Sequence, residues 1–161
     1  MGFEYDSLIT HVQNVKSSRE FHGEDELLAV DFSLKITRAE NEGEWSDIMS
    51  YLLDDSPEQA LTTIERAALG VSSLVFDAEY DDVKINVRQS TKKVAAFVHA
   101  KISKFRWATE GGSEFISCNC RALSDGAQIG ALCEQLRHKV RIETVSHQSE
   151  LDLDGDGEDG A

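Results

Sequence analysis

The residues best suited to binding chemistry in this 161-residue chain are cations interleaved with aromatic rings in its second half. A strand places alternate side chains on one face, and one parity collects Phe97, Lys101, Phe105 and Trp107. This combination suits single-stranded nucleic acid, because bases stack on rings while cations track phosphates. The predicted interface consists of Lys92, Lys93, Phe97, Lys101, Lys104, Phe105, Arg106, Trp107, Arg121, Arg137, Lys139 and Arg141. The alternative is a core strand whose rings face inward and whose lysines lie at the rim.

The other reactive residue types form no pattern that predicts catalysis or a metal site. The acidic run at 152–157 matches only the first half of a calcium loop, and the cysteine pair at 118 and 120 lacks a second Cys/His pair for zinc. The five histidines fit no nucleophile and base arrangement. Glu110-Gly111-Gly112 suits a hairpin turn better than a phosphate cradle. We therefore expect a protein that is not an enzyme and that uses no metal and no cofactor.

The three cysteines are expected to be reduced thiols. Cys118 and Cys120 would lie on one face of a strand about 6.5 to 7 Å apart, near the limit for a disulfide, and Cys133 leaves the set odd. The N-terminus does not resemble a signal peptide, and nowhere do about 18 apolar residues follow one another. These features predict a cytoplasmic protein that does not contact membranes.

Hairpins are the elements expected to position the interface. Residues 27–36 alternate between apolar and polar types, and a Gly-containing connector joins them to an extended segment at 8–21, so the two predict a long antiparallel hairpin. A second hairpin is expected around Asp81-Asp82 and a third around Gly111-Gly112. The pattern at 140–145 predicts a last strand.

Capping patterns predict the helices. Ser56, followed by Pro57 and Gln59, indicates a helix to about Ala68, and a shorter helical segment is expected over 45–53. Ser124-Asp125-Gly126 opens another helix, with one apolar face made of Ile129, Leu132, Cys133 and Leu136.

The predicted fold class is α+β. We expect a single antiparallel β-rich domain over residues 1–148, with about six to seven strands in hairpins and two helices. A two-sheet sandwich is the alternative architecture. Residues 149–161 are expected to form a disordered acidic tail, because they have too little apolar content to offset the entropy of ordering.

Charge is unevenly distributed along the chain. Residues 1–83 carry 5 basic and 19 acidic side chains, residues 84–141 carry 11 and 4, and residues 142–161 carry none and 7. The acidic tail is therefore expected to compete with phosphates for the basic second half. The acidic first half could instead imitate DNA phosphates or occupy a basic cleft of a partner protein. The candidates for that surface are Glu24, Asp25, Glu26, Glu42, Glu44 and Asp47.

Residues 92–145 resemble a group of small phage and prophage proteins that are encoded in early regions near replication or recombination genes. The segments that carry the resemblance are Val98–Arg106, Glu110–Gly112, Ile129–Leu136 and Lys139–Ile142, with the His22-Gly23-Glu24 turn of the first hairpin. The resemblance implies a phage origin and work on nucleic acid or on host machinery. A β-rich body with an acidic C-terminus is also similar to the single-stranded-DNA-binding proteins of phages and bacteria.

These features predict a non-enzymatic phage early protein that binds single-stranded nucleic acid through the Lys92–Arg141 region and is autoinhibited by its acidic tail. The alternative hypothesis is an inhibitor of a host or anti-phage defence protein that acts through the acidic first half. A third is an oligomeric interaction protein whose edge strands pair between copies.

Overall fold

A computed structural model describes residues 3–22, 25–56 and 73–146, apart from the side chains of residues 20–22 and 25–27. In chain order its elements are β1 (Tyr5–His22), β2 (Asp25–Thr37), α1 (Glu42–Asp54), β3 (Ser73–Val75), β4 (Tyr80–Gln89), β5 (Lys92–Glu110), β6 (Ser113–Ser124), α3 (Gly126–Cys133) and β7 (Lys139–Ser146). Antiparallel strands dominate, which confirms the predicted β-rich α+β class. The predicted helix at 57–68 and the predicted tail at 149–161 lie outside the described residues.

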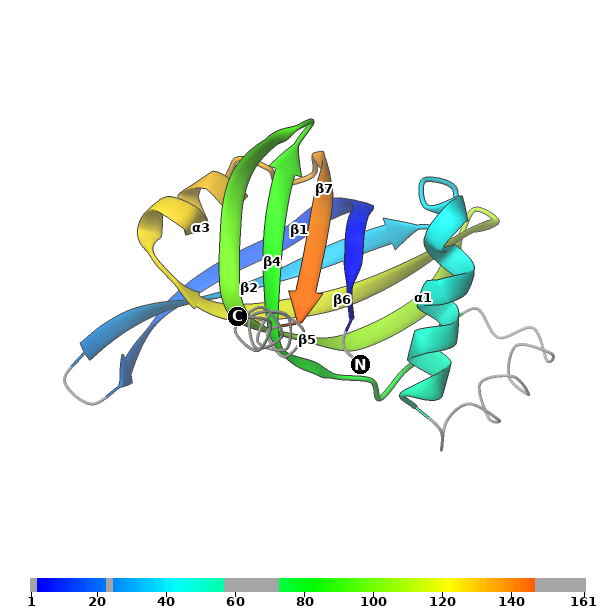
Figure 1. Ribbon diagram of the computed structural model, residues 1–161, viewed down its shortest axis with the longest axis horizontal. Coiled ribbons are helices and arrows are strands. Elements are labelled where there is room, and N and C mark those ends of the chain that lie inside the picture. The colour runs from blue at the N-terminus through cyan, green and yellow to red at the C-terminus, as the bar shows by residue number, and fades with distance from the viewer. Residues whose placement is uncertain (1–2, 23–24, 57–72, 147–161) are drawn as a thin grey trace, which may run out of the picture.

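Six of the described strands form a closed cycle of hydrogen-bonded neighbours, β1-β2-β6-β5-β4-β7, and β3 adds to one edge of β5. The two longest strands bend so that each takes part in two layers. β1 pairs with β7 through residues 5–11 and with β2 through residues 11–22, while β5 pairs with β4 through residues 92–102 and with β6 through residues 101–110. We call the β4–β7 side the β4 layer and the β2–β6 side the β6 layer. Figure 1 shows the two layers crossing at a steep angle, so one continuous sheet replaces the two separate sheets of a sandwich.

Bulges allow the strands to bend from one layer into the other. Asn14 in β1, Asp82 in β4, and His99 and Lys104 in β5 all have positive φ angles between 53° and 58°. The strand register shifts at each of these positions, because one extra residue is inserted opposite its partner strand. Bulged strands that cross between layers at corners are the usual device of orthogonal sheet packing.

The hairpin predicted around Asp81-Asp82 is wrong. Both aspartates lie inside β4, at its bulge, and both are exposed. The chain turns instead at residues 90–91, where Ser90 has a φ of 59°, and β3 pairs with β5 rather than with β4. Two polar residues between apolar runs are typical of a turn. An exposed bulge also leaves both side chains in solvent, and it does so without ending the strand. The hairpins at 8–36 and 110–113 are confirmed.

Helix α1 confirms and extends the helical segment predicted over 45–53. Its inner face buries Trp45, Ile48 and Leu52. Asn41, just before the helix, has its side chain turned toward β1: its amide accepts a hydrogen bond from the Ile9 N–H at 2.8 Å and donates one to the Ile9 carbonyl at 2.8 Å. This buried amide therefore fixes the start of α1 against the sheet.

Helix α3 lies at the opposite end of the molecule from α1 (Figure 1). It begins as predicted, because the Asp125 carboxylate accepts a hydrogen bond from the Gln128 N–H at 2.8 Å. Ile129 and Leu132 are buried, whereas Cys133 and Leu136 are exposed. The prediction of one continuous apolar face through Leu136 is wrong because the helix ends at Cys133.

The core lies between the two layers. Phe32 of β2 contacts Phe97 of β5 with ring centroids 5.3 Å apart, and Phe105 of β5 meets Tyr80 of β4 edge to face at 5.7 Å. Cys118 and Cys120 of β6 are buried free thiols, as expected. Among the described residues, no helix has the length and apolar character needed to cross a membrane.

Candidate nucleic-acid interface

The aromatic side chains predicted to stack on bases belong mainly to the core. Phe97 and Phe105 are about 1% and 0% exposed. Trp107 is half-buried, and its indole N–H donates a hydrogen bond to Glu114 Oε1 at 3.1 Å. The prediction of one face that carries both rings and cations is therefore wrong, and β5 is the core strand of the alternative interpretation.

Two bulges in β5 explain why strict alternation along the sequence does not predict which of its side chains face outward. The bulge at His99 reverses the alternation after Phe97, so Lys101 points outward. The bulge at Lys104 reverses it again, so Phe105 points inward. Rings and lysine that share a parity in the sequence therefore lie on opposite sides of the sheet.

One group of the predicted cations lies on the outer surface of the β6 layer. Lys101, Lys104, Arg106 and Arg121 are all exposed there. Lys101 lies directly opposite Arg121, but it pairs with Glu79 at 3.4 Å, and Arg121 pairs with Asp31 of β2. Two of these four cations, Lys101 and Arg121, therefore have an acidic side chain as partner. Lys104 and Arg106 have no ion partner among the described residues.

A second group forms a row across the β4 layer. Lys93 of β5 lies directly opposite Arg88 of β4, which lies directly opposite Arg141 of β7. We call Lys93, Arg88 and Arg141 the basic row. Like charges directly opposite each other on neighbouring strands destabilise a sheet, so this arrangement is not explained by stability.

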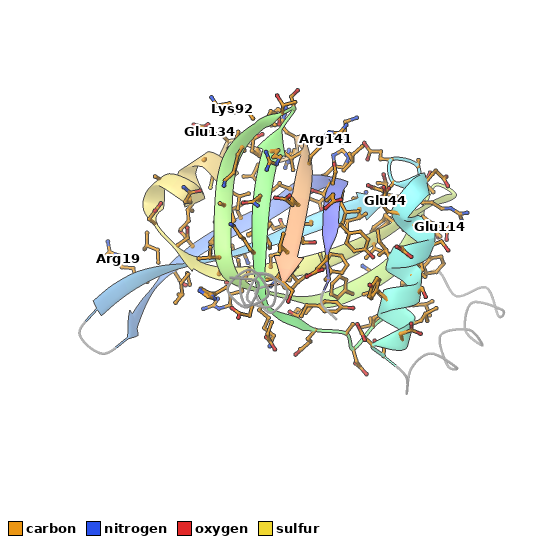
Figure 2. All side chains as sticks on the ribbon, viewed as in Figure 1. Arg19, Glu44, Lys92, Glu114, Glu134 and Arg141 are labelled. Atoms are coloured by element: carbon orange, nitrogen blue, oxygen red, sulfur yellow. The ribbon has the colours of Figure 1, made fainter. Side chains whose placement is uncertain are left out.

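The partners of the basic row only partly compensate its charge. Arg88 Nη2 lies 3.6 Å from Glu143 Oε1. The same oxygen accepts a hydrogen bond from the side-chain amide of Asn86 at 2.6 Å. Arg141 Nη1 donates to Ser7 Oγ, a neutral acceptor, at 3.0 Å. Lys92 lies next to the row, and Figure 2 shows Lys92 and Arg141 at the same end of the β4 layer. An anion is the ligand that this surface can accommodate.

Glu40 forms an ion pair with Lys139 of β7, whose Nζ lies 3.6 Å from Glu40 Oε2. Thr37 Oγ1 donates to Glu40 Oε1 at 2.7 Å, and His11 Nε2 lies 2.7 Å from the same oxygen. Burial raises the pKa of Glu40, but the hydrogen bonds from Thr37 and His11 and the charge of Lys139 outweigh it and leave the pKa below its ordinary value. Lys139 is therefore partly neutralised and contributes less to the surface than the basic row.

The remaining predicted cation, Arg137, lies in the segment between α3 and β7. Arg137 is exposed, has a φ of 64°, and lines an open groove of about 580 Å³ with Gln13, Asn14, Val15 and Leu136. The twelve predicted residues thus comprise three aromatic residues of β5, four cations on the β6 layer, two members of the basic row (Lys93 and Arg141), two cations near that row in the sequence (Lys92 and Lys139), and Arg137.

Sequence reasoning missed Arg88. The signal was present, because Arg88 belongs to the basic stretch after residue 83 and sits four residues before Lys92 across a turn. Only the strand register shows that Arg88 faces Lys93 on one side and Arg141 on the other.

The acidic surface of the alternative hypothesis is described only in part. Glu42, Glu44 and Asp47 are exposed on α1, and Arg38 lies 3.8 Å from Glu42. Glu24 and the side chains of Asp25 and Glu26 lie outside the described residues. Among the described side chains, no three His, Cys, Asp or Glu residues gather as a group that could hold a metal ion.

Comparison with known proteins found no matching family, no matching curated protein and no matching solved structure. The resemblance to small phage proteins and the acidic-surface hypothesis stay predictions.

Proposed function

We propose that this protein binds the phosphate backbone of nucleic acid at the basic row of the β4 layer, without catalysis. The observation that carries the proposal is the cross-strand alignment of Lys93, Arg88 and Arg141. Three aligned cations repel one another in the free protein, and a bound polyanion would turn that repulsion into attraction while releasing counterions.

The dimensions of the row fit several phosphates. Residues directly opposite on neighbouring antiparallel strands have Cα atoms about 4.5 to 5.5 Å apart, so three strands extend the row over roughly 10 Å. At about 3.4 Å of helix axis per phosphate on each strand of a duplex, this length corresponds to about three phosphates. Because Phe97 and Phe105 are buried, base stacking does not contribute to this mode, and affinity should depend on salt more than on base sequence.

Binding can be measured by fluorescence anisotropy of labelled single-stranded and duplex oligonucleotides, titrated with the full chain over a range of salt concentrations. The triple variant Lys93→Gln/Arg88→Gln/Arg141→Gln should make the plot of log K against log salt concentration less steep. The magnitude of its negative slope should decrease by about 2, at about 0.7 per lost single-strand phosphate contact. At about 0.05 M salt the affinity should fall on the order of a hundredfold.

The matched control is Lys101→Gln/Lys104→Gln/Arg106→Gln, which makes the same change in net charge on the β6 layer. This variant should retain most of the affinity and nearly the same salt slope. Equal losses in the two triple variants would mean that overall charge, not the basic row, governs binding. No detectable binding by the parent chain at low salt would refute the proposal.

The same assay tests the predicted tail. Removing residues 149–161 deletes 6 of the 30 acidic side chains, so it should tighten binding most at low salt, where screening is weakest. An affinity that the deletion leaves unchanged at every salt concentration would contradict autoinhibition while leaving the role of the basic row open to the variant test.

A further inference from the structure

Two adjoining hollows lie where β1 meets the segment between α3 and β7. The larger is the open groove of about 580 Å³ that is lined by Gln13, Asn14, Val15, Leu136 and Arg137. The smaller, which we call the cationic hollow, has a volume of about 190 Å³ and is lined by His11, Gln13, Lys35, Thr37 and Arg137. Because Gln13 and Arg137 line both, the two hollows are parts of one concave surface.

Basic side chains from several elements gather at the cationic hollow. Lys35 of β2 and Lys139 of β7 lie directly opposite His11 of β1, one on each side. Arg137 comes two residues before Lys139, in the segment after α3. Residues that face each other on neighbouring antiparallel strands have Cα atoms about 4.5 to 5.5 Å apart. Four basic residues are therefore held within a small region.

Nearby carboxylates compensate only part of this charge. Glu40 is shared by the histidine of β1 and the lysine of β7. Glu110 Oε2 lies 3.0 Å from Lys35 Nζ, but Glu110 is exposed, so solvent screens this pair. The guanidinium of Arg137 has no ion partner in the part of the chain that the structure describes. An anion is the ligand that would compensate it.

The backbone at Arg137 gives an independent reason to assign this arginine a function. Its φ of 64° is left-handed, a conformation that is unfavourable for residues with a Cβ and favours glycine or asparagine. The Arg137 N–H donates to the Val12 carbonyl at 2.8 Å, so β1 holds this backbone in place. An arginine without a described side-chain partner therefore occupies a strained position that glycine would fill at lower cost. Strained residues that their surroundings hold in place are typical of ligand sites.

The larger groove offers a surface of a different kind. Gln13 and Asn14 contribute side-chain amides, and Leu136 is an apolar side chain that is 37% exposed. The groove volume lies within the range of about 300 to 1,000 Å³ that is usual for small-molecule sites. An organic group with both polar and apolar parts therefore fits beside the charged group in the cationic hollow.

We propose that the two hollows together bind an organic phosphate monoester. Its phosphate lies in the cationic hollow, where the planar guanidinium of Arg137 and the ammonium of Lys35 donate to the phosphate oxygens. A tetrahedral phosphate suits donors that converge from different elements better than a planar carboxylate does. The organic part lies in the groove against Leu136 and the two amides. A free nucleotide and the phosphorylated end of an oligonucleotide share this chemistry, and the inference does not depend on backbone binding by the basic row.

The test titrates the full chain with AMP, inorganic phosphate, adenosine and succinate at low salt, by calorimetry and by backbone amide chemical shifts. AMP should bind most tightly, because it alone of the four fills both hollows with matching groups. Adenosine lacks the phosphate, inorganic phosphate lacks the organic part, and succinate carries planar carboxylates instead. Shifts caused by AMP should centre on residues 11–15, 35–37 and 136–139.

The variant Arg137→Gly separates a binding role from a structural one. It should raise the Kd of AMP about tenfold, because charge-assisted hydrogen bonds to the phosphate are lost. The urea midpoint of the free protein should stay the same or rise, because glycine adopts the left-handed conformation without strain. Lys35→Gln should raise the Kd about fivefold, as expected for one partly screened ion pair.

The matched control is Lys104→Gly. Lys104 is also an exposed cation without a described ion partner, and it has a φ of 57°, but it lies on the β6 layer and lines neither hollow. The control therefore removes the same charge and relieves the same backbone conformation elsewhere. It should change the Kd of AMP by less than twofold.

Several results would overturn the inference. These are equal weakening of AMP binding by Arg137→Gly and Lys104→Gly, binding of adenosine, inorganic phosphate or succinate as tight as that of AMP, amide shifts centred on the basic row, or no detectable AMP binding at millimolar concentration. A trinucleotide with a 5′ phosphate distinguishes the two sources of the ligand. Arg137-dependent binding tighter than that of AMP would identify the end of a nucleic acid, weaker binding would identify a free nucleotide, and either order supports the shared chemistry.

Discussion

Truncation of Phe105 distinguishes a core role for the aromatic residues of β5 from a base-stacking role. The Phe105 ring is 0% exposed, meets Tyr80 edge to face at 5.7 Å and lies 5.5 Å from the ring of Phe3. Replacing a fully buried Phe by Ala costs about 3 to 5 kcal/mol, from lost burial and from the cavity left behind. A domain of this size is stable by about 5 to 15 kcal/mol, so Phe105→Ala should remove a large part of the total.

Phe105→Leu should cost about 2 kcal/mol, because leucine keeps most of the apolar volume but loses the edge-to-face contact with Tyr80. Urea denaturation followed by far-ultraviolet circular dichroism measures both changes. With a slope of about 2 kcal/mol per molar urea, the midpoint should fall by about 1 M for leucine and about 2 M for alanine. Val98→Ala is the control on the same strand, since Val98 is 46% exposed, and should change stability by less than about 0.5 kcal/mol.

The affinity of the folded fraction for oligonucleotides should be the same in Phe105→Leu as in the parent chain. If Phe105→Leu were as stable as Val98→Ala but bound single strands more weakly, the ring would have to be accessible to bases. That result would refute the burial of Phe105 and restore the stacking interface.

Two further predictions follow from titratable groups. The pKa of Glu40 lies below its ordinary value because the hydrogen bonds and charges around it outweigh burial, so its ionised form adds stability above the unfolded pKa of about 4.3. The stability difference between the parent chain and Glu40→Gln should therefore shrink as pH falls below that value through the folded pKa, and a difference that stayed constant down to pH 3 would contradict this. The Cys133 thiol is exposed and the two thiols of β6 are buried, so a thiol reagent should modify one cysteine rapidly and the other two only on unfolding. Rapid modification of all three would show that β6 is not in the core.

The strands and one helix cap could be predicted locally. The alternation over 27–36 matches β2, in which Val30, Phe32, Leu34 and Ile36 are all buried. The stretch Ser124-Asp125-Gly126 predicts the start of α3, and the Asp125 side chain caps that helix. These elements are predictable because period-two burial and capping depend only on residues a few positions apart.

The hairpin at Asp81-Asp82 shows where local information is ambiguous. Two acidic residues between apolar runs are compatible with a turn or with an exposed bulge. The structure has the bulge, with Asp82 at a φ of 58°, because β4 continues along β5 as far as Gln89. The pairing partner, about twenty residues away in the sequence, decides between the two.

For the candidate site, the inventory of charges could be predicted locally: an acidic first half, a basic stretch over 84–141 and exposed positions for most of its cations. The positions of those charges relative to one another could not be predicted in this way, because they depend on strand register. The bulges at His99 and Lys104 contain no glycine that would indicate them in the sequence. Each bulge nevertheless moves every later side chain of β5 to the other face of the sheet. The pairing of β4 with β5 on one side and with β7 on the other places Arg88 between Lys93 and Arg141, because cross-strand neighbours are fixed by register, and register is set by all the paired strands together.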